Sequence, residues 1–411
     1  MPRVVITGVG VISPIGHTAT ESWDNLIKGI SGIGPITQFD ASQIPVHIAG
    51  EVKDFDPGKY MNPKEARRMS RASQLAIAAA RMALADARLP EPLPDGERVA
   101  TWIGNGGGGL EVVDRELNVL RTKGYNQVSP FALTSFLPNM AAHHVSLVAG
   151  AKGPISTVVT ACASGTQAVG EGMDLIRHGR ADIVFAGGVE GLIHETSVAS
   201  FARTGALSTR NDDPGHACRP FDATRDGTVV SEGAAILVLE KLEDALARNA
   251  RIYAEVIGHA SSADAFHLAR PDPEAQGAVR AIRWALEDAR VTPREVDYIN
   301  AHGTATLLND PSETLAVKKV FGDYAYQLPI SSSKAVLGHS MGAAGAIEAV
   351  ICMYALYHGL IPPTWNYEQR DPACDLDYVP NQPRQADLKV VLSNSFGMGG
   401  QNACLVLRKY A

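Results

Sequence analysis

The chain has few cysteines and no close pair of them. Its 411 residues include five, at Cys162, Cys218, Cys352, Cys374 and Cys404, and no C-x-x-C motif occurs. An odd number of widely spaced cysteines argues against a disulfide framework and against a cysteine zinc site. We therefore expect free thiols and a reducing compartment.

Long apolar runs and a surplus of basic residues are also lacking. No stretch reaches the roughly 20 apolar residues that span a bilayer. The N-terminus shows none of the three regions of a secretory signal. Lys and Arg number 37 against 44 Asp and Glu, for a net charge of −7, which argues against a generally basic nucleic-acid-binding surface. These absences predict a cytoplasmic protein that binds neither nucleic acid nor a membrane.

Apolar strand-like runs alternate with helical patterns along the chain. Strands are predicted at 3–12, 99–104, 155–161, 181–188, 234–240, 251–261, 296–303 and 389–397, and helices at 70–87, 165–179 and 274–289. Continuous Val/Ile runs between amphipathic helices are typical of parallel sheets covered on both faces, and the closely spaced runs before and after residue 250 predict mixed sheets. The sequence therefore predicts an α/β protein, with a boundary between two parts of the chain near residue 250. Residues 205–228, rich in loop-forming residues, are expected to form a lid or a packed connector.

A cysteine lies at the junction between a predicted strand and a predicted helix. In VVTACASGTQ, residues 158–167, Cys162 comes just before the helix begins. Free amides and the helix dipole at that place favour an exposed, acidified thiolate, which is a nucleophile. Small neighbours leave room for a substrate carbonyl. A lone cysteine is also often a small buried hydrophobic residue, so the assignment depends on further residues.

Two histidines in glycine-bounded turns complete a reactive set. YINAHGTAT places His302 after one predicted strand, and SSSKAVLGHSMGAAGA places His339 five residues after Lys334. With Cys162 they form a nucleophile-plus-base combination. A metal site favours ligands closer together in sequence, so no metal is predicted. In NSFGMGGQN, residues 394–402, a Gly-x-Gly-Gly turn can expose the backbone amides that an oxyanion site needs.

These four motifs, in this order and at these separations, resemble those of the β-ketoacyl-[acyl-carrier-protein] synthases. The similarity runs from VVITGVGVISPIG to the last strand, and it is greatest to the elongating type II synthases of fatty acid synthesis and to type II polyketide ketosynthases. It implies a thiolase-like fold, in which two similar halves with mixed five-stranded sheets form α-β-α-β-α layers. The halves would be residues 1–250, with the nucleophile, and 251–411, with both histidines. A homodimer is also implied.

The resemblance implies a decarboxylative Claisen condensation. Cys162 would take an acyl chain from an acyl-carrier protein as a thioester. Malonyl-carrier protein would then lose carbon dioxide, and its enolate would attack the acyl group to give 3-oxoacyl-carrier protein. The backbone amides of Cys162 and Met398 would form the oxyanion hole, while His302 and His339 would bind the malonyl thioester carbonyl.

Further residues are assigned by the same resemblance. Lys334 would place a positive charge in the site, with Glu313 or Glu348 as its partner. Thr304 and Thr306 would contact the phosphopantetheine arm of the carrier protein. Because that arm carries the substrates, no separate cofactor is expected.

The acyl pocket departs from the pattern of many elongating synthases. Gly107 stands where a bulky aliphatic residue is common, and Met398 replaces a phenylalanine. With Phe396 they would line the acyl site. The two changes predict a wider or straighter channel for longer, branched or unsaturated chains, unless another side chain such as Phe201 refills the space.

Only part of the basic surface that the family uses to bind its carrier protein is present in this sequence. Lys64, Arg67 and Arg68 form a basic patch that suits an acidic partner, although a solvated helix face would look the same. A second basic pair is absent, because Asn126 and Gln127 stand in its place. The partner is therefore expected to be a dedicated carrier protein.

Three other interpretations compete with this resemblance. Residues 104–109 satisfy the Gly-x-Gly-x-x-Gly dinucleotide pattern, but the acidic residue that follows comes too early. A non-catalytic chain-length-factor subunit usually lacks the nucleophile, whereas Cys162, His302 and His339 are all present here. The resemblance implies a homodimer and leaves a heterodimer open. A thiolase or an initiating synthase has a His-Asn pair, for which Asn300 is the candidate. The pathway stays open among fatty acid, polyketide and aryl-polyene synthesis.

Overall fold

A ten-stranded mixed sheet runs through the computed structural model, which describes residues 1–410. Its strand order is β10-β9-β13-β14-β8-β1-β7-β6-β4-β5. One half consists of β1 (Val4–Ile12), β4 (Val99–Asn105), β5 (Ile155–Val158), β6 (Ile183–Glu190) and β7 (Gly233–Lys241). The other consists of β8 (Ala254–Ala263), β9 (Tyr298–Asn300), β10 (Ile330–Ser331), β13 (Val390–Gly397) and β14 (Gln401–Lys409).

The two halves of the sheet have the same connectivity. In the N-terminal half β4 lies parallel to β5 and β6, and β7 lies antiparallel to β6 and β1. In the C-terminal half β9 lies parallel to β10 and β13, and β14 lies antiparallel to β13 and β8. The halves join edge to edge where Val4–Ile6 of β1 pair with Ala254–Val256 of β8. The expected pair of similar five-stranded sheets is thus present, and the predicted boundary at residue 250 falls between β7 and β8.

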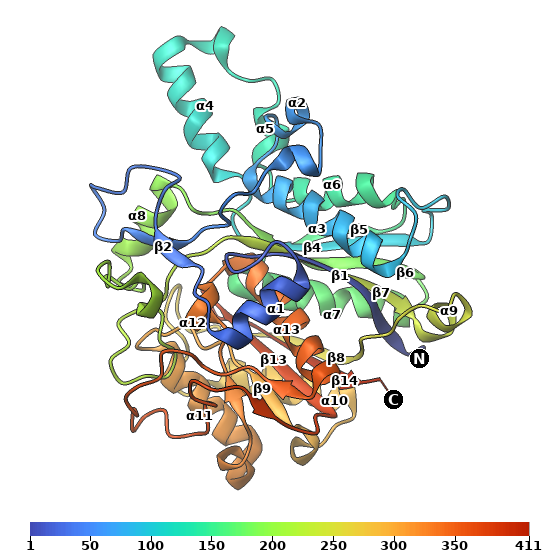
Figure 1. Ribbon diagram of the computed structural model, residues 1–411, viewed down its shortest axis with the longest axis vertical. Coiled ribbons are helices and arrows are strands. Elements are labelled where there is room, and N and C mark those ends of the chain that lie inside the picture. The colour runs from blue at the N-terminus through green and yellow to red at the C-terminus, as the bar shows by residue number, and fades with distance from the viewer. Residues whose placement is uncertain (411) are drawn as a thin grey trace.

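Helices cover the outer faces of the two halves and fill the space between them (Figure 1). On the N-terminal half lie α3 (Arg71–Ala87) and α6 (Met140–Ala149). On the C-terminal half lie α10 (Gln276–Ala289) and α11 (Asn309–Phe321). Between the halves, α7 (Ser164–Arg177) packs against α13 (Ala344–His358). This gives the predicted α-β-α-β-α layers.

The central helices approach closely because glycines stand where they meet. A Cβ on Gly165 would lie 2.7 Å from the amide nitrogen of Ala346, and one on Gly345 would lie 2.6 Å from that of Thr166. The segment Met341–His358 is long and apolar enough to cross a membrane by composition, with a mean hydropathy of 1.2, contrary to the expectation that no such run exists. Since 89% of it is buried between the two halves, its apolar character belongs to the protein core.

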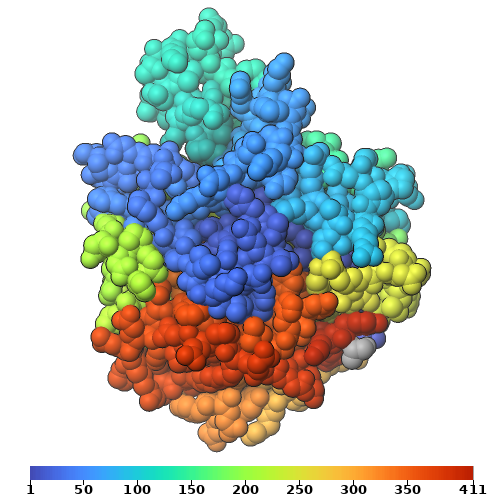
Figure 2. All heavy atoms as spheres, viewed as in Figure 1, coloured from blue at the N-terminus to red at the C-terminus, as the bar shows by residue number. Residues whose placement is uncertain are grey.

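One segment extends away from the layered body. It contains α4 (Leu110–Lys123) and α5 (Ala132–Phe136), which project at the top of Figures 1 and 2. Within α4 only Val112 is buried. Large apolar side chains along the segment are exposed: Leu110, Leu117, Leu120, Tyr125, Phe131, Leu133 and Leu137. We call this segment, residues 110–137, the α4–α5 arm.

The shorter elements surround the ends of the sheet. The helices are α1 (Ala19–Lys28), α2 (Pro63–Ala66), α8 (Glu195–Arg203), α9 (Leu242–Ala247) and α12 (Lys334–Leu337), and the strands are β2 (Ile33–Pro35), β3 (Ile48–Gly50), β11 (Leu360–Ile361) and β12 (Arg384–Gln385). Residues 205–228 form a packed connector. In this connector the buried carboxylate of Asp222 accepts the amides of Glu368 and Gln369 at 2.6 Å, and Phe221 stacks on Tyr378 with ring centroids 3.9 Å apart.

Candidate active site

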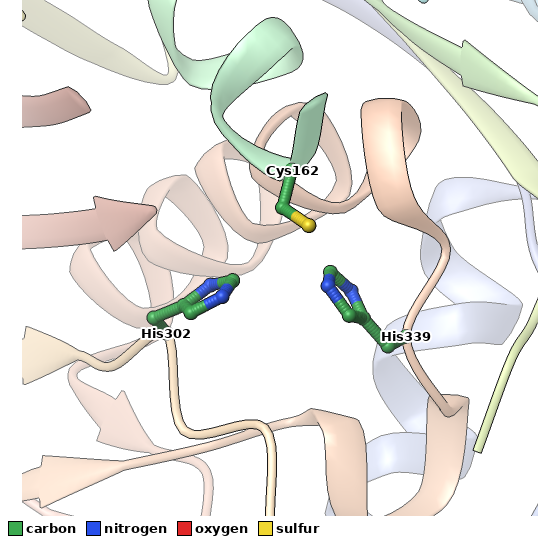
Figure 3. Close-up of side chains that lie close together, drawn as sticks. All are labelled: Cys162, His302 and His339. Atoms are coloured by element: carbon green, nitrogen blue, oxygen red, sulfur yellow. The ribbon is translucent and has the colours of Figure 1, made fainter. Parts of the chain in front are cut away.

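Cys162 lies in a single 3₁₀ turn, Ala161–Ala163, between β5 and the start of α7. Ala161 has a φ of 50°, in the left-handed region that non-glycine residues seldom adopt. This turn directs the thiol into the space between two imidazole rings, as Figure 3 shows. The strand-turn-helix position predicted for the cysteine is the one observed.

The environment of the thiol differs from the expectation. Cys162 is buried, with 9% of its surface exposed, and burial raises its pKa to about 11. The amide of Met398 and the charge of Lys334 act in the opposite direction but are outweighed. The prediction of an exposed, acidified thiolate is therefore wrong for the resting protein, because removal from water disfavours the charged form. The proton must leave when substrate arrives.

The two histidines come from separate loops of the C-terminal half. His302 follows β9 and His339 follows α12, and their ring centroids lie 5.3 Å apart with the planes at 81°. Both are nearly fully buried, at 2% and 3% exposure. Burial first, and the nearby Lys334 charge second, hold the pKa of each well below its ordinary value, so both rings are neutral.

The reacting atoms form a compact group. The Cys162 sulfur and one ring nitrogen from each histidine all lie within 4.8 Å of one another. Both ring nitrogens of His339 are buried and without a hydrogen-bond partner within residues 1–410, so the nitrogen that carries the proton is free to donate to a substrate carbonyl. The same three donors match the ligand types of a zinc site, although they are far apart in sequence. Sequence spacing alone was therefore a weak argument against a metal, and the prediction of none stays a prediction.

The two candidate partners of Lys334 have different roles. Lys334 is 1% exposed, pairs with the carboxylate of Glu348 on α13, and donates to the carbonyl oxygen of His302 at 2.6 Å. Glu313 on α11 instead accepts the amides of His302 and Gly303, both at 2.8 Å. One carboxylate thus balances the buried lysine, while the other fixes the loop that carries His302.

Backbone groups from both halves meet at Cys162. Gly397 ends β13, and a Cβ placed on it would lie 3.2 Å from the Cys162 amide nitrogen. The amide of the next residue, Met398, favours the charged form of the Cys162 thiol and so lowers its pKa. Both amides, those of Cys162 and Met398, therefore act on the thiol, and their role as the oxyanion hole stays a prediction.

Two site residues escaped the sequence reasoning. The Met341 sulfur lies 3.9 Å from that of Cys162, so the two side chains are in contact. Glu190, fully buried at the end of β6, accepts the amides of Gly106 and Gly342 at 3.0 Å and that of Gly107 at 3.2 Å. An acidic residue at the end of a continuous apolar strand was the available signal for Glu190.

The expected space at Gly107 is already filled. A Cβ on Gly107 would lie 2.3 Å from Cδ2 of Leu192, a buried residue of the cluster that contains Cys162. Leu192 therefore supplies the bulk that Gly107 lacks, so the glycine by itself does not widen the site. Phe201 also packs on this cluster, but the nearest atoms at Gly107 all belong to Leu192. Phe396 faces the His302 ring at a centroid distance of 5.9 Å, and Met398 is 39% exposed.

The other predicted residues lie on the His302 loop and around α2. Thr304 and Thr306, on the His302 loop, hydrogen-bond to each other at 3.0 Å. Lys64, Arg67 and Arg68 are exposed around α2. Arg68 stacks over Phe131 of the α4–α5 arm, with its guanidinium carbon 4.4 Å from the ring centroid.

Asn300 does not belong to the reacting group. It ends β9 and is 0% exposed, and neither polar atom of its side chain has a partner within residues 1–410. The two side chains beside the Cys162 thiol are those of His302 and His339, and no asparagine is among them (Figure 3). The His-Asn alternative is therefore not supported by the geometry.

Comparison with known families gives a match along most of the chain. Residues 1–245 match the beta-ketoacyl synthase N-terminal domain, and residues 253–368 match the C-terminal domain. The 3-oxoacyl-[acyl-carrier-protein] synthase 2 of Synechocystis is 47% identical over 408 residues, covering 99% of this chain and 98% of that protein. The protein of the same name from Coxiella burnetii is 46% identical over 407 residues, with the same shares covered.

Solved structures show the same fold. The ishigamide ketosynthase/chain length factor aligns with a TM-score of 0.93 and 41% identity over the whole of both chains. A type II polyketide ketosynthase solved with its acyl-carrier protein aligns with a TM-score of 0.91 and 36% identity, also over both whole chains. These similarities confirm the thiolase-like architecture, and the chain belongs to the beta-ketoacyl synthase family.

Proposed function

We propose that this protein catalyses the decarboxylative condensation of an acyl chain with malonyl-acyl-carrier protein, the elongation step of fatty acid or polyketide synthesis. The observation that carries the proposal is the group of Cys162, His302 and His339, whose donor atoms lie within 4.8 Å of one another in a chain of this family. The curated relatives named 3-oxoacyl-[acyl-carrier-protein] synthase 2 support it.

The first half-reaction is acyl transfer. The Cys162 sulfur attacks the thioester carbonyl of acyl-carrier protein, forms a new thioester, and releases the phosphopantetheine thiol, which takes up the proton lost by Cys162. The negatively charged oxygen of the tetrahedral intermediate accepts hydrogen bonds from the backbone amides of Cys162 and Met398. Because the thiol has a pKa of about 11, its deprotonation accompanies attack rather than preceding it.

The second half-reaction forms the new carbon–carbon bond. The C–C bond to the malonyl carboxylate breaks to release carbon dioxide, and the electron pair becomes an enolate whose oxygen lies between His302 and His339. The enolate carbon attacks the acyl-Cys162 carbonyl, and the carbon–sulfur bond breaks. The sulfur leaves as a thiolate, which takes a proton from solvent to restore the thiol. Neutral imidazoles suit this step, since each carries one N–H donor. Lys334 adds a positive charge beside the developing negative charge.

The proposed partner is an acyl-carrier protein, which approaches the exposed Lys64, Arg67 and Arg68 and inserts its arm past Thr304 and Thr306. In this proposal the reaction uses no other cofactor and takes place in the cytoplasm. A homodimer is proposed from the exposed apolar side chains of the α4–α5 arm and from β5, an edge strand that exposes Ile155. Apolar patches and unpaired strand edges of this kind are usually covered by a partner.

A specialised polyketide or polyene ketosynthase is the second candidate. The ishigamide ketosynthase/chain length factor and a ketosynthase from Xenorhabdus doucetiae solved with its chain length factor, at 41% and 27% identity, favour it. In that case the α4–α5 arm and β5 would meet a chain-length-factor subunit instead of a second copy. A chain that is itself a non-catalytic subunit is disfavoured, because the reactive cysteine and both histidines are present.

The test is intact-protein mass after incubation with a panel of acyl-carrier proteins, followed by malonyl-carrier protein. We expect an acyl adduct that is absent in Cys162→Ala and that malonyl-carrier protein converts into 3-oxoacyl-carrier protein. No adduct from any chain, alone or with a co-expressed chain-length-factor subunit, would refute the proposal. The preferred chains distinguish the fatty acid pathway from the polyketide pathway.

A further inference from the structure

The three side chains of the condensing site are also a set of metal-binding groups. The Cys162 sulfur and one ring nitrogen from each of His302 and His339 lie within 4.8 Å of one another. Thiolate sulfur and imidazole nitrogen are preferred donors for Zn²⁺, and zinc sites of enzymes commonly have three protein ligands with a water molecule in the fourth position. We call these three residues the Cys-His-His group.

The group is assembled from distant parts of the chain. Cys162 lies between β5 and α7, His302 follows β9 and His339 follows α12, and Figure 3 shows both rings beside the thiol. All three residues are buried. Within residues 1–410, no other set of three or more His, Cys, Asp and Glu side chains brings its ligand atoms together in this way. The site is therefore specific to this place in the fold.

The ring nitrogens have no competing partners. Both nitrogens of His339 and Nδ1 of His302 are buried without a hydrogen-bond partner within residues 1–410. Buried polar atoms in this condition cost free energy, which a bound ligand recovers. A structural histidine would have to give up a hydrogen bond before its ring could bind a metal. These two rings give up none.

The spacing becomes tetrahedral after a small movement. Zinc lies about 2.3 Å from a thiolate sulfur and about 2.0 Å from an imidazole nitrogen, so tetrahedral ligand atoms lie roughly 3.3–3.6 Å apart. The donor atoms of the group have to approach one another by about 1 Å to reach this spacing. Rotation of the histidine side chains supplies the movement. The loop itself need not shift, because Glu313 accepts the backbone amide of His302 at 2.8 Å.

The nearby lysine does not prevent a cation from binding. The ammonium of Lys334 pairs with the carboxylate of Glu348 and donates to the carbonyl oxygen of His302 at 2.6 Å. This buried ion pair carries no net charge. Metal binding breaks the S–H bond of Cys162, forms a sulfur–zinc bond and releases the proton to solvent, so the thiolate supplies one negative charge to the metal.

We propose that the Cys-His-His group of the unacylated protein is an inhibitory binding site for Zn²⁺. The metal is bound by the same sulfur that receives the acyl chain, so metal binding and acylation of Cys162 exclude each other. Zinc takes no part in the condensation itself. The binding of the metal stands on the geometry of the three side chains, whereas the inhibition rests on the proposed function.

The experiment titrates the full-length protein, treated with EDTA and kept in a non-thiol reductant, with ZnCl₂ in competition with a zinc-sensitive dye. We expect one Zn²⁺ per chain. Cys162→Ala, His302→Ala and His339→Ala should each weaken binding by at least about 100-fold, because even the loss of a residue that only supports a metal ligand costs about 10–100-fold.

Matched controls make the same changes elsewhere. Cys352→Ala on α13 and the exposed His143→Ala on α6 should bind Zn²⁺ as tightly as the unaltered protein. Met341→Leu removes the thioether sulfur 3.9 Å from that of Cys162 and should also leave the affinity unchanged, since thioethers select Cu(I) rather than Zn²⁺. Loss of binding in Cys162→Ala alone, or in none of the variants, would overturn the three-ligand site.

Two measurements on the unaltered protein do not depend on how the variants fold. Co²⁺ in place of Zn²⁺ should give the intense visible absorption of a tetrahedral site together with a sulfur-to-cobalt charge-transfer band. Zn²⁺ should slow the alkylation of Cys162 by iodoacetamide at least about tenfold, as read by intact mass, and EDTA should restore the rate. A weak octahedral cobalt spectrum, or alkylation at an unchanged rate, would contradict the proposal.

Acylation separates this inference from the proposed function. Saturating Zn²⁺ should block the transfer of an acyl chain from acyl-carrier protein to Cys162, and the acylated protein should not take up the metal. Acylation at an undiminished rate in saturating Zn²⁺ would refute the inhibition. If no carrier protein acylates Cys162 while Zn²⁺ still binds through the three side chains, the proposed condensation fails and the metal site stands.

Discussion

At the start of α7 and at the start of α13 the chain makes the same turn, and one of the two turns carries the nucleophile. Each helix follows a single 3₁₀ turn that opens with a residue in the left-handed region, Ala161 with φ 50° and Met341 with φ 43°. By position in the turn, Cys162 of the N-terminal half corresponds to Gly342 of the C-terminal half. The two turns pack against each other across the middle of the molecule.

The difference lies in what faces the two turns. Glu190 ends an eight-residue strand of the N-terminal half, and its carboxylate accepts the Gly342 amide at 3.0 Å. Gly397 ends the corresponding eight-residue strand of the C-terminal half, and it presents no side chain to the Cys162 amide. One turn is thereby anchored by a carboxylate, and the other keeps its amide available for an oxyanion. Duplicated architecture supplies both turns, and one residue at each strand end decides which turn can react.

The largest effect is expected from the nucleophile of the N-terminal half. Cys162→Ala should lower condensation about a thousandfold or more, because no other group can hold the acyl chain. Product formation from acyl- and malonyl-carrier protein measures it. Cys352→Ala makes the same change in the central helix of the C-terminal half and should retain activity. A substantial rate in Cys162→Ala would break the assignment of the two turns.

Variants of the two histidines test whether the C-terminal half supplies these side chains for condensation alone and not for acylation of Cys162. His302→Ala and His339→Ala should each lower condensation about 10²–10³-fold, the usual cost of a lost oxyanion donor. Acylation of Cys162 should persist in both variants, because the amides that serve that step are intact. The two rates are measured separately by intact mass and by product formation, with the exposed His143→Ala as the control. Equal loss of both steps would contradict the division.

The packing of Leu192 against Gly107 predicts a compensating pair beside the thiol. Leu192→Ala should destabilise the protein by about 2–5 kcal/mol through the cavity it leaves. Gly107→Ile should cost about 1–3 kcal/mol by overpacking. The double variant should be more stable than the sum of the two costs implies, as measured by urea unfolding. Gly107→Ile combined with Leu207→Ala, a leucine of the same cluster, should be additive, and additivity in both pairs would refute the contact.

The smallest effect concerns the carboxylate that anchors the C-terminal turn. Burial raises the pKa of Glu190 to about 7, above its ordinary value of 4.5. Between these pH values the folded state binds more protons than the unfolded state, so the free energy of unfolding falls as pH rises, by roughly 1 kcal/mol per pH unit. Glu190→Gln should show a shallower fall between pH 5 and 7 in urea titrations. An unchanged slope would mean that the carboxylate is already ionised in this range.

Much of the fold could be predicted from local patterns. The eight predicted strands correspond to β1, β4–β9 and β13, and the three predicted helices correspond to α3, α7 and α10. β14 was not among the predicted strands. The duplication was not visible in the residues, because equal connectivity does not require equal side chains. The duplication entered the prediction through the family resemblance. The pairing of three residues of β1 with three of β8 is a long-range contact, which no local sequence pattern shows.

The residues of the candidate site could be predicted from the sequence, but their burial and their contacts could be predicted less well. Cys162, His302 and His339 could be found because each lies in a turn marked by nearby glycines, after a strand for the first two and after α12 for His339. The direction of the Cys162 pKa was wrong, since the helix position was visible in the sequence but the degree of burial was not. The partner of Lys334 and the packing of Leu192 both depend on which segments meet in space.

The position of the chain ends has a consequence for rearranging the molecule. Met1, Arg3, Arg408 and Lys409 line one cavity of about 720 Å³, and both ends of the chain appear on the same side of Figure 1. A short linker can join them there, and new ends can be opened at the exposed Arg251 between the two halves. Such a circular permutant would synthesise the histidine half first and the cysteine half second. A permutant that folds and condenses would show that the order in which the halves are made does not determine the arrangement they reach.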